Sequence, residues 1–331
     1  MGTFEKREIG GYLELEINRG SIFHNNAWAL NSGRSCLEWV ITAKNIRTIA
    51  LPYFICDVVY EVCLKHGVKI IKYHVDSDFQ PVNVPEEDCW LYLVNYYGTL
   101  KSETVLEYRR VTEGQSSEKR KIIGIIVDNT QAYYEKPIDG IYTLYTSRKY
   151  FGVPDGAFLY APDLEGYEEF DIDKSAAHTN HLIGRLEGNA SDYYMAFKEN
   201  DNRLREAGIK RMSRLTENLL RGIDYEYVKE RRTENYSYLN EKLNNLNRMN
   251  AELIKDIEGP FAYPLWVESG AKLREKLVDE RIYVPILWPN ILREVSPSTL
   301  EYNLAKNILP LPCDQRYGID EMRRICEVIG R

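Results

Sequence analysis

The sequence predicts an α/β protein, with a large domain built on a mostly parallel β-sheet and a smaller α/β domain after it. Continuous apolar runs rich in β-branched residues, such as Ile122–Val127, are typical of parallel strands covered on both faces. Strand-like and helix-like segments alternate between residues 46 and 95, which favours right-handed crossovers within one sheet. Strand and helix signals return after residue 250. We therefore expect a large domain over residues 1–215, and a linking helix with a small C-terminal domain over residues 216–331.

The elements of the first 121 residues follow from hydrophobic periodicity and from turn residues. Tyr12–Ile17 alternates apolar and polar side chains, which predicts an edge strand or a hairpin arm. The polar tract Glu107–Lys121 predicts an exposed helix end followed by a mobile loop. The other expected elements are a helix over Ser35–Ala43, a strand over Ile46–Leu51, a helix over Phe54–His66 closed by Gly67, and strands over Val68–His74 and Cys89–Asn95.

The rest of the chain predicts three central strands, a wrapping segment and a C-terminal unit. Leu164–Asn202 is rich in acids, Gly and Asn and lacks a clear period, so we expect it to wrap the site without forming core. A long helical pattern runs from Ser213 to about Leu246, with a break at Gly222. The remaining expected elements are strands over Ile122–Val127, Gly140–Tyr145, Ala157–Tyr160, Ala262–Val267 and Arg281–Pro285, and helices over Ala271–Asp279 and Ile319–Ile329.

Composition and charge argue against several classes of protein. The 331 residues carry a net charge of −7 without a long Lys/Arg run, which argues against a nucleic-acid partner. No apolar run approaches the roughly 18–20 residues that span a bilayer, and the N-terminus lacks the apolar core of a signal peptide. We therefore expect a cytoplasmic protein with no membrane partner. Six cysteines without a CxxC pair suggest buried thiols, and the pair His178 and His181 lacks further ligands, so we expect no metal site.

Polar residues follow the predicted central strands at the point where each strand ends. Asp128 ends the first strand, Gln131 comes three residues later, and Lys149 follows the second strand. Open α/β sheets bind ligands beyond the carboxyl ends of their strands. An acid and a lysine held there are the minimum equipment for pyridoxal phosphate (PLP) chemistry, in which the lysine forms a Schiff base and the acid keeps the pyridine nitrogen protonated. The turn at Ser32 and Gly33 opens a predicted helix, whose free N–H groups suit a phosphate.

Several motifs occur together in one order along the chain, over about Asn31 to Arg331. They are SGR before a helix, LPYF, YYG, VDNTQ, TSRK-x-FGVPDGA, RMSRLT and LPCDQRYG. This order resembles the DegT/DnrJ/EryC1/StrS family of PLP-dependent nucleotide-sugar aminotransferases, and the chain looks like a divergent member. The resemblance implies a PLP-dependent transferase of fold type I, which is the aspartate-aminotransferase-like fold.

The resemblance also implies roles for individual residues. Lys149 and Asp128 would be catalytic: the lysine would hold the cofactor and then move the proton, and the aspartate would pair with the pyridinium nitrogen. A neutral amine is needed for that role, so the pKa of Lys149 should be lowered by burial and by neighbouring positive charge. The other expected cofactor contacts are Gln131 at the phenolic oxygen, Thr146 or Ser147 and the turn Ser32, Gly33 and Arg34 at the phosphate, and Tyr53 or Phe54 stacked on the ring. The candidate substrate contacts are Tyr97, His181, Arg185 and Arg211.

The sequence departs from the family at two positions. Ile209 stands where the family places an amide that reaches the partner subunit's site, and Asp314 stands where many members have His. The resemblance implies a homodimer with its active site near the interface. The expected activity is transfer of an amino group, from L-glutamate, to a nucleotide-linked keto-sugar in amino-sugar or cell-surface polysaccharide biosynthesis. Two alternatives stay open: a PLP-dependent sugar dehydratase, although those carry His at the lysine position, and a regulatory or structural protein that has lost catalysis.

Overall fold

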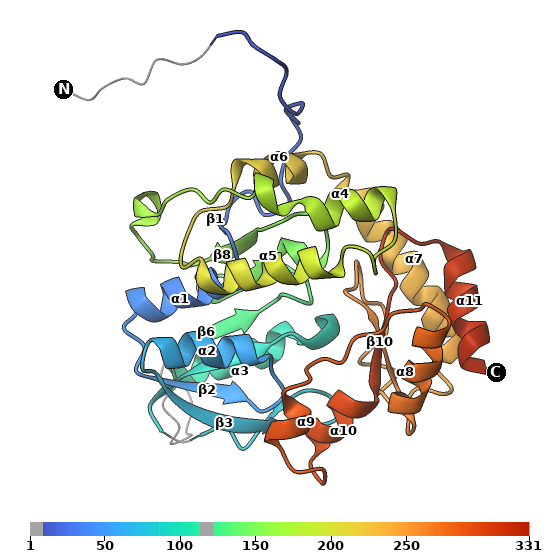
Figure 1. Ribbon diagram of the computed structural model, residues 1–331. Helices are drawn as coiled ribbons and strands as arrows, with labels where there is room; N and C mark the ends of the chain where they lie inside the picture. The colour runs from blue at the N-terminus through green and yellow to red at the C-terminus, as the bar shows by residue number, and fades with distance from the viewer. Residues whose placement is uncertain (1–8, 86, 113–121, 331) are drawn as a thin grey trace.

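The computed structural model describes residues 9–85, 87–112 and 122–330, and its centre is an eight-stranded sheet (Figure 1). The strand order is β1-β8-β7-β6-β5-β2-β3-β4. Strands β3, β2, β5, β6 and β7 run parallel to their neighbours in that order, whereas β1, β8 and β4 pair antiparallel. The strands are β1 (Trp28–Leu30), β2 (Thr48–Pro52), β3 (Lys69–Val75), β4 (Pro81–Val82), β5 (Cys89–Val94), β6 (Ile122–Asp128), β7 (Tyr142–Thr146) and β8 (Ala157–Tyr160).

Helices cover this sheet and connect it to a second, two-stranded sheet of β9 (Tyr263–Trp266) and β10 (Ile308–Leu311). In Figure 1 the C-terminal elements α8 to α11 gather to the right of and below the large sheet, and α4 and α5 lie above α1. The helices are α1 (Gly33–Ala43), α2 (Asp57–Lys65), α3 (Ser102–Thr112), α4 (Asn180–Glu187), α5 (Tyr194–Glu206), α6 (Arg214–Arg221), α7 (Tyr225–Leu243), α8 (Gly270–Asp279), α9 (Ile291–Glu294), α10 (Leu300–Asn307) and α11 (Ile319–Gly330).

The central strands are apolar because both of their faces are covered. All six residues of β5 are buried, and four of the seven residues of β6 lie in a continuous buried run that ends at Asp128. Gly124 lies directly under the ring of Trp90, where an added Cβ would approach ring atoms to 2.6 Å. Only glycine allows that close approach, so the break in the apolar run of β6 has a packing reason. The large, mostly parallel sheet confirms the predicted α/β class.

Four sequence predictions about elements were wrong. Ala157–Tyr160 is a strand but runs antiparallel to β7. Leu164–Asn202 contains α4 and most of α5. Tyr12–Ile17 is not a strand, and its large apolar side chains are exposed. Arg281–Pro285 is not a strand either, and α9, α10 and β10 were not predicted.

Two other predictions are tested only in part or not at all. Of the tract Glu107–Lys121, α3 takes the part up to Thr112, and residues 113–121 lie outside the described part of the chain. The domain boundary predicted at residue 215 falls within α6 and stays a prediction.

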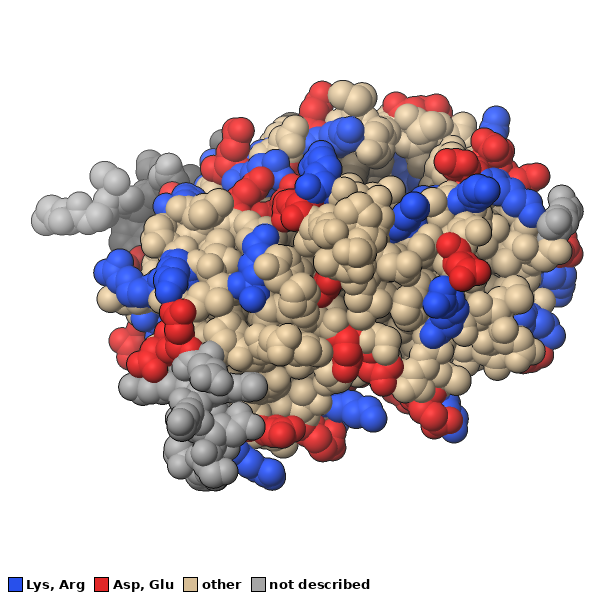
Figure 2. Space-filling model, turned by 90° about the horizontal axis from the view of Figure 1, so that it is seen from below, with Lys and Arg blue, Asp and Glu red and all other residues tan. Residues whose placement is uncertain are grey.

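Charged side chains of both signs occur together on one face of the molecule. On the face seen in Figure 2, acidic and basic groups alternate and neither sign forms a large patch of its own. Across the described ranges, no helix is both long enough and apolar enough to cross a membrane.

Candidate active site

Two neighbouring parallel strands, β6 and β7, end side by side and carry polar residues that the sequence singled out. β6 ends at Asp128 and β7 at Thr146, and Asp128 pairs with Leu144 in the sheet. Lys149 follows in the 3-10 turn η2 (Ser147–Lys149). Ligands of open α/β sheets bind at this carboxyl edge, so these residues lie where such a fold places its site.

Two hydrogen bonds fix the orientation of Asp128. The residue is 8% exposed, its Oδ2 accepts from the hydroxyl of Tyr92 at 2.8 Å, and its Oδ1 accepts from the N–H of Thr130 at 2.9 Å. Burial, and next the charge of Asp128, raise the pKa of Tyr92 well above its ordinary value, so this hydroxyl remains a donor. A carboxylate fixed in this way can hold a proton on a heterocyclic nitrogen that faces it.

The amine of Lys149 lies close to this carboxylate and is poorly suited to carry a charge. Burial among protein atoms is the main cause that lowers its pKa, and the charges of Arg148 and Arg34 lower it further, against an opposing effect of Asp128. Solvent still reaches the side chain. Its Nζ donates to the hydroxyl of Thr130 at 3.0 Å and lies 5.8 Å from the centre of the Phe261 ring. A lowered pKa with these two causes agrees with the prediction, and it favours the neutral amine, the form that acts as nucleophile and base, more than in an ordinary lysine.

The first turn of α1 lies against the end of β7. Ser32 caps the helix, because its side chain accepts from the N–H of Ser35 at 3.2 Å. An added Cβ at Gly33 would lie 2.9 Å from the Oγ1 of Thr146. The structure therefore brings together the turn and the threonine that were predicted to hold a phosphate. The first N–H groups of a helix have no acceptor within it, so they are available to an anion here.

Gln131 and Ser147 lie in the same region, and Gln131 has a partner elsewhere. The Oε1 of Gln131 accepts from the N–H of Tyr97 at 3.0 Å, and Tyr97 has a φ of 55°. Gln131 thus supports the backbone of Tyr97 in a conformation that residues other than glycine rarely adopt. Ser147 is fully buried, and its hydroxyl lies beside that of Tyr133. Of the two residues predicted as alternatives at the phosphate, Thr146 is the one that borders the α1 turn.

The predicted ring-stacking residues have other partners. Phe54 is 1% exposed and packs against Phe79 and Trp288. Phe54 is thus part of the core in the structure, and its contact with the cofactor ring stays a prediction. Tyr53 stacks on His74 with ring centres 4.6 Å apart, and that contact occupies one face of its ring.

The four candidate substrate residues do not form one group. Tyr97 is 1% exposed, and its contact with substrate stays a prediction. His181 of α4 is 9% exposed and its Nδ1 has no hydrogen-bond partner among the described residues. Arg185, one turn later, donates to the hydroxyl of Tyr317 at 3.3 Å.

Arg211, the fourth candidate, has other partners. Its guanidinium pairs with Glu168, and its backbone bridges Leu30 at the edge of the large sheet. Ile209, which replaces the family's amide, packs against the apolar core of its own chain.

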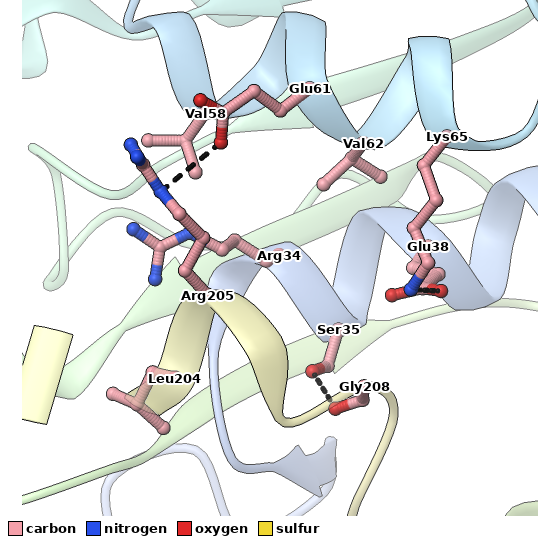
Figure 3. Close-up of a pocket in the computed structure, with 10 residues that line it drawn as sticks. All are labelled: Arg34, Ser35, Glu38, Val58, Glu61, Val62, Lys65, Leu204, Arg205 and Gly208. Atoms are coloured by element: carbon pink, nitrogen blue, oxygen red, sulfur yellow. Dashed lines mark hydrogen bonds and ion pairs between the residues drawn. The ribbon is translucent and has the colours of Figure 1, made fainter. Parts of the chain in front are cut away.

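An ion-pair network beside the α1 turn was not predicted. Asp201 of α5 accepts from Arg34 at 3.5 Å and from Arg148 at 3.2 Å, and Arg205 of α5 lies 3.2 Å from Glu61 of α2. Figure 3 shows Arg205 reaching from α5 toward Glu61 of α2, with Arg34 of α1 beside it. The cavity that they line has a volume of about 60 Å³, far below the roughly 300 Å³ at which ligand pockets begin. These pairs therefore join α5 to the site without forming a ligand pocket.

Sequence reasoning also missed Thr130 and Cys56. Thr130 lies inside the DNTQ motif, so its position next to Asp128 could have marked it. Cys56 lies close enough to Lys149 for the charge of each to influence the pKa of the other. Its position just before α2 gave no comparable signal.

The residues at this edge fit pyridoxal phosphate. The oriented carboxylate of Asp128 suits the pyridine nitrogen, and the Lys149 amine of lowered pKa suits the aldehyde. The start of α1, where Gly33 lies close to Thr146, suits the phosphate. In the ranges that the structure covers, no group of three or more His, Cys, Asp or Glu side chains could hold a metal ion.

Solved structures with this arrangement of elements include sugar-modifying enzymes. No family model and no curated protein matches the sequence. The sugar aminotransferase CalS13 from Micromonospora echinospora superposes with a TM-score of 0.62 at 15% identity, over 93% of this chain and 88% of that one. A DegT DnrJ EryC1 StrS aminotransferase from Brucella abortus gives 0.59 at 16% identity, over 92% and 85%. The chain has the fold of these aminotransferases.

The same fold also serves a different reaction. The E. coli GDP-4-keto-6-deoxy-D-mannose-3-dehydratase, solved with bound hydrated PLP, superposes with a TM-score of 0.61 at 14% identity, over 91% of this chain and 87% of that one. The predicted PLP-dependent transferase fold is confirmed, and this fold by itself does not determine a reaction.

Proposed function

We propose that this protein is a PLP-dependent aminotransferase that acts on a nucleotide-linked keto-sugar, with L-glutamate as amino donor, in amino-sugar or cell-surface polysaccharide biosynthesis. The observation that carries the proposal is the pair Asp128 and Lys149 at one sheet edge. The carboxylate there is oriented by two hydrogen bonds, and the amine has a lowered pKa.

Each residue of the edge has a defined task in this proposal. Asp128 holds a proton on the pyridine nitrogen, while Thr146 and the N–H groups of the α1 turn bind the phosphate. When bound, pyridoxal phosphate supplies a ring that stabilises negative charge on a substrate carbon. Lys149 would hold the cofactor through its aldehyde carbon, with loss of water, and its free neutral amine could take up and return a proton at the substrate carbon.

The lysine favours transfer over the alternative dehydration. In the family that the motifs resemble, the dehydratases carry His at this position, and a histidine cannot join the aldehyde. The retained pair of Lys149 and Asp128 also argues against a chain that has lost catalysis, because both groups that the proposed chemistry needs are present at one sheet edge.

Cofactor attachment tests the proposal directly. The purified protein with pyridoxal phosphate should be yellow, and borohydride should fix the cofactor to the peptide that contains Lys149. Lys149→Ala should abolish this labelling, whereas the exposed Lys136→Ala should leave it unchanged. A colourless protein, or label that persists in Lys149→Ala, would refute the proposal that Lys149 holds pyridoxal phosphate. Added L-glutamate should bleach the colour and release 2-oxoglutarate; a coloured protein that no amino donor bleaches would favour the non-catalytic alternative.

Gly33 offers a separate test of the phosphate position. A methyl group there would meet the Oγ1 of Thr146 at 2.9 Å, so Gly33→Ala must push the threonine and the helix start apart. We expect Gly33→Ala to weaken binding of pyridoxal phosphate by roughly tenfold, the equivalent of one charge-assisted hydrogen bond. Binding of pyridoxal, which lacks the phosphate, should hardly change. Equal losses for both compounds in fluorescence titrations would show that the turn does not recognise the phosphate.

A further inference from the structure

Thr130 lies between the two residues that carry the proposed chemistry. Its hydroxyl accepts from the Nζ of Lys149 at 3.0 Å, and its N–H donates to the Oδ1 of Asp128 at 2.9 Å. Its Cγ2 would lie 3.9 Å from a Cβ added at Gly33, so the same side chain borders the α1 turn. One half-buried residue thus touches or borders the amine, the carboxylate and the phosphate turn.

The hydrogen bond to Thr130 is the contact that fixes the position of the Lys149 amine among the described residues. Asp128 and Cys56 favour the charged form of the amine, whereas burial, Arg148 and Arg34 disfavour it. Within the part of the chain that the structure describes, none of these groups forms a hydrogen bond or ion pair with Nζ, and the Phe261 ring centre is 5.8 Å away. Charges that act on a flexible amine without a hydrogen bond shift its protonation, but they do not fix its orientation.

A threonine hydroxyl is suited to this task. A hydroxyl can accept from an ammonium or a neutral amine and can also donate, so the contact survives a change in the protonation of Lys149. The β-branched side chain has few rotamers, and the N–H bond to Asp128 fixes the backbone that carries it. The hydroxyl is therefore a rigid acceptor at the end of β6.

We propose that Thr130 is a positioning residue for Lys149. Its hydroxyl holds the free amine at the end of β6, near Asp128, and sets the direction from which the amine meets a carbonyl carbon. The inference rests on the proposed function only for the identity of that carbonyl.

The amine can be examined in the full-length chain freed of cofactor. Brief labelling with acetic anhydride across a pH series, followed by mass spectrometry of the Lys149 peptide, gives the titration midpoint of the amine. Hydrogen bonds to charged donors are the stronger ones, so the Thr130 hydroxyl favours the protonated lysine. Thr130→Val keeps the shape without the hydroxyl and should shift the midpoint downward, while Thr130→Ser should restore the wild-type midpoint. Thr42→Val is the control, because the Thr42 hydroxyl bonds only to carbonyls of α1.

A second measurement tests the orientation of the amine through its rate of reaction. Attachment of pyridoxal to Lys149, recorded by absorbance, should be roughly two- to tenfold slower in Thr130→Val, the loss that one hydrogen bond represents. Thr130→Ser should again behave as the wild type. If valine prevents folding, Thr130→Ala repeats both comparisons.

The outcomes separate this inference from the proposed function. A Thr130→Val midpoint equal to that of the wild type, or a serine variant that behaves like the valine variant, would overturn the positioning role. A wild-type chain that takes up no pyridoxal phosphate would overturn the proposed function instead. The labelling comparison would still be valid in that case, because it is made without cofactor.

Discussion

Among single residues, Lys149 combines its proposed chemistry with a cost to stability. Its pKa is lower in the folded chain than in the unfolded one, chiefly through burial. Below the folded pKa both states are protonated and the folded state bears the whole free-energy cost of the lowered pKa. This cost disappears as the pH rises past the unfolded value of 10.5. Lys149→Met should therefore raise the Tm of the cofactor-free protein near neutral pH. The gain should be only about 1–2 °C, because solvent reaches the amine.

The pH dependence distinguishes this effect from a general gain in packing. The difference in Tm between Lys149→Met and the wild type should shrink as the pH approaches 10.5. A difference that stays constant with pH in calorimetric scans would contradict the argument. Lys136→Met, at an exposed position, serves as the matched control.

A second residue, Asp155, explains why the FGVPDGA turn marked the site in the sequence. It is fully buried and accepts from the N–H of Ser213 at 2.8 Å, from the Ser213 hydroxyl at 2.6 Å and from the Thr216 hydroxyl. Asp155→Ala leaves these donors at the start of α6 unpaired and should lower the free energy of unfolding by roughly 2–4 kcal/mol. Asp155→Asn, which keeps one acceptor, should lose less. Urea denaturation measures both, and a loss below about 0.5 kcal/mol for alanine would refute this account.

At the scale of elements, the sequence predicted the parallel core well because period and burial decide those strands locally. The direction predicted for Ala157–Tyr160 was wrong, because an apolar run has the same pattern in a parallel and an antiparallel strand. The connection over residues 147–156 is shorter than the dozen or more residues that a parallel crossover needs, so the antiparallel direction could have been inferred. Thr130 could likewise have been found, since it lies next to Asp128 in the motif.

Helices α4 and α5 could not have been predicted from local pattern, because their stabilising contacts are tertiary. In α5, Asn200 and Leu204 are the buried residues, and the Nδ2 of Asn200 donates to the carbonyl of Pro154 at 2.7 Å. Asp201, the next residue, pairs with Arg34 and Arg148. Those partners lie far away in the sequence, so no window of the sequence contains the signal.

Helix α7 holds the site from the C-terminal side through Arg232. This residue is 2% exposed and donates to the carbonyls of Tyr150 at 3.1 Å and Pro260 at 2.9 Å, and to Gln315 at 2.8 Å. Arg232→Met keeps the length of the side chain but leaves buried acceptors unpaired, so it should cost roughly 2–4 kcal/mol in urea denaturation. Its neighbour Arg231 forms a partly exposed pair, and Arg231→Met should cost less than about 1 kcal/mol. Equal losses for the two variants would show that Arg232 does not hold these loops.

For the whole molecule, the exposed apolar side chains bear on the proposed homodimer. Leu13 is 91% exposed, Leu15 59% and Ile17 65%, and the chain is anchored to the body just after them, where Asn18 bonds with Asn218. Figure 1 shows this N-terminal arm leaving the body above α6. Helices α4 and α5 also expose large apolar side chains, namely Ile183, Leu186, Tyr194, Met195 and Phe197. Apolar surfaces of this kind mark sites of association, and a two-fold dimer can cover an arm and a helix face on each copy at once.

The arm therefore provides the test of the dimer. Leu13→Glu combined with Leu15→Glu should raise the dimer Kd at least tenfold, because burying two leucines contributes about 3 kcal/mol or more and 1.4 kcal/mol is tenfold. The circular dichroism spectrum should stay unchanged, since both side chains are exposed in one copy. Glu14→Gln, in the same segment, should leave the Kd near that of the wild type. Sedimentation velocity over a range of concentrations measures all three proteins. A wild type that remains monomeric would refute the homodimer, whereas an unchanged Kd in the double variant would refute only the part played by the arm.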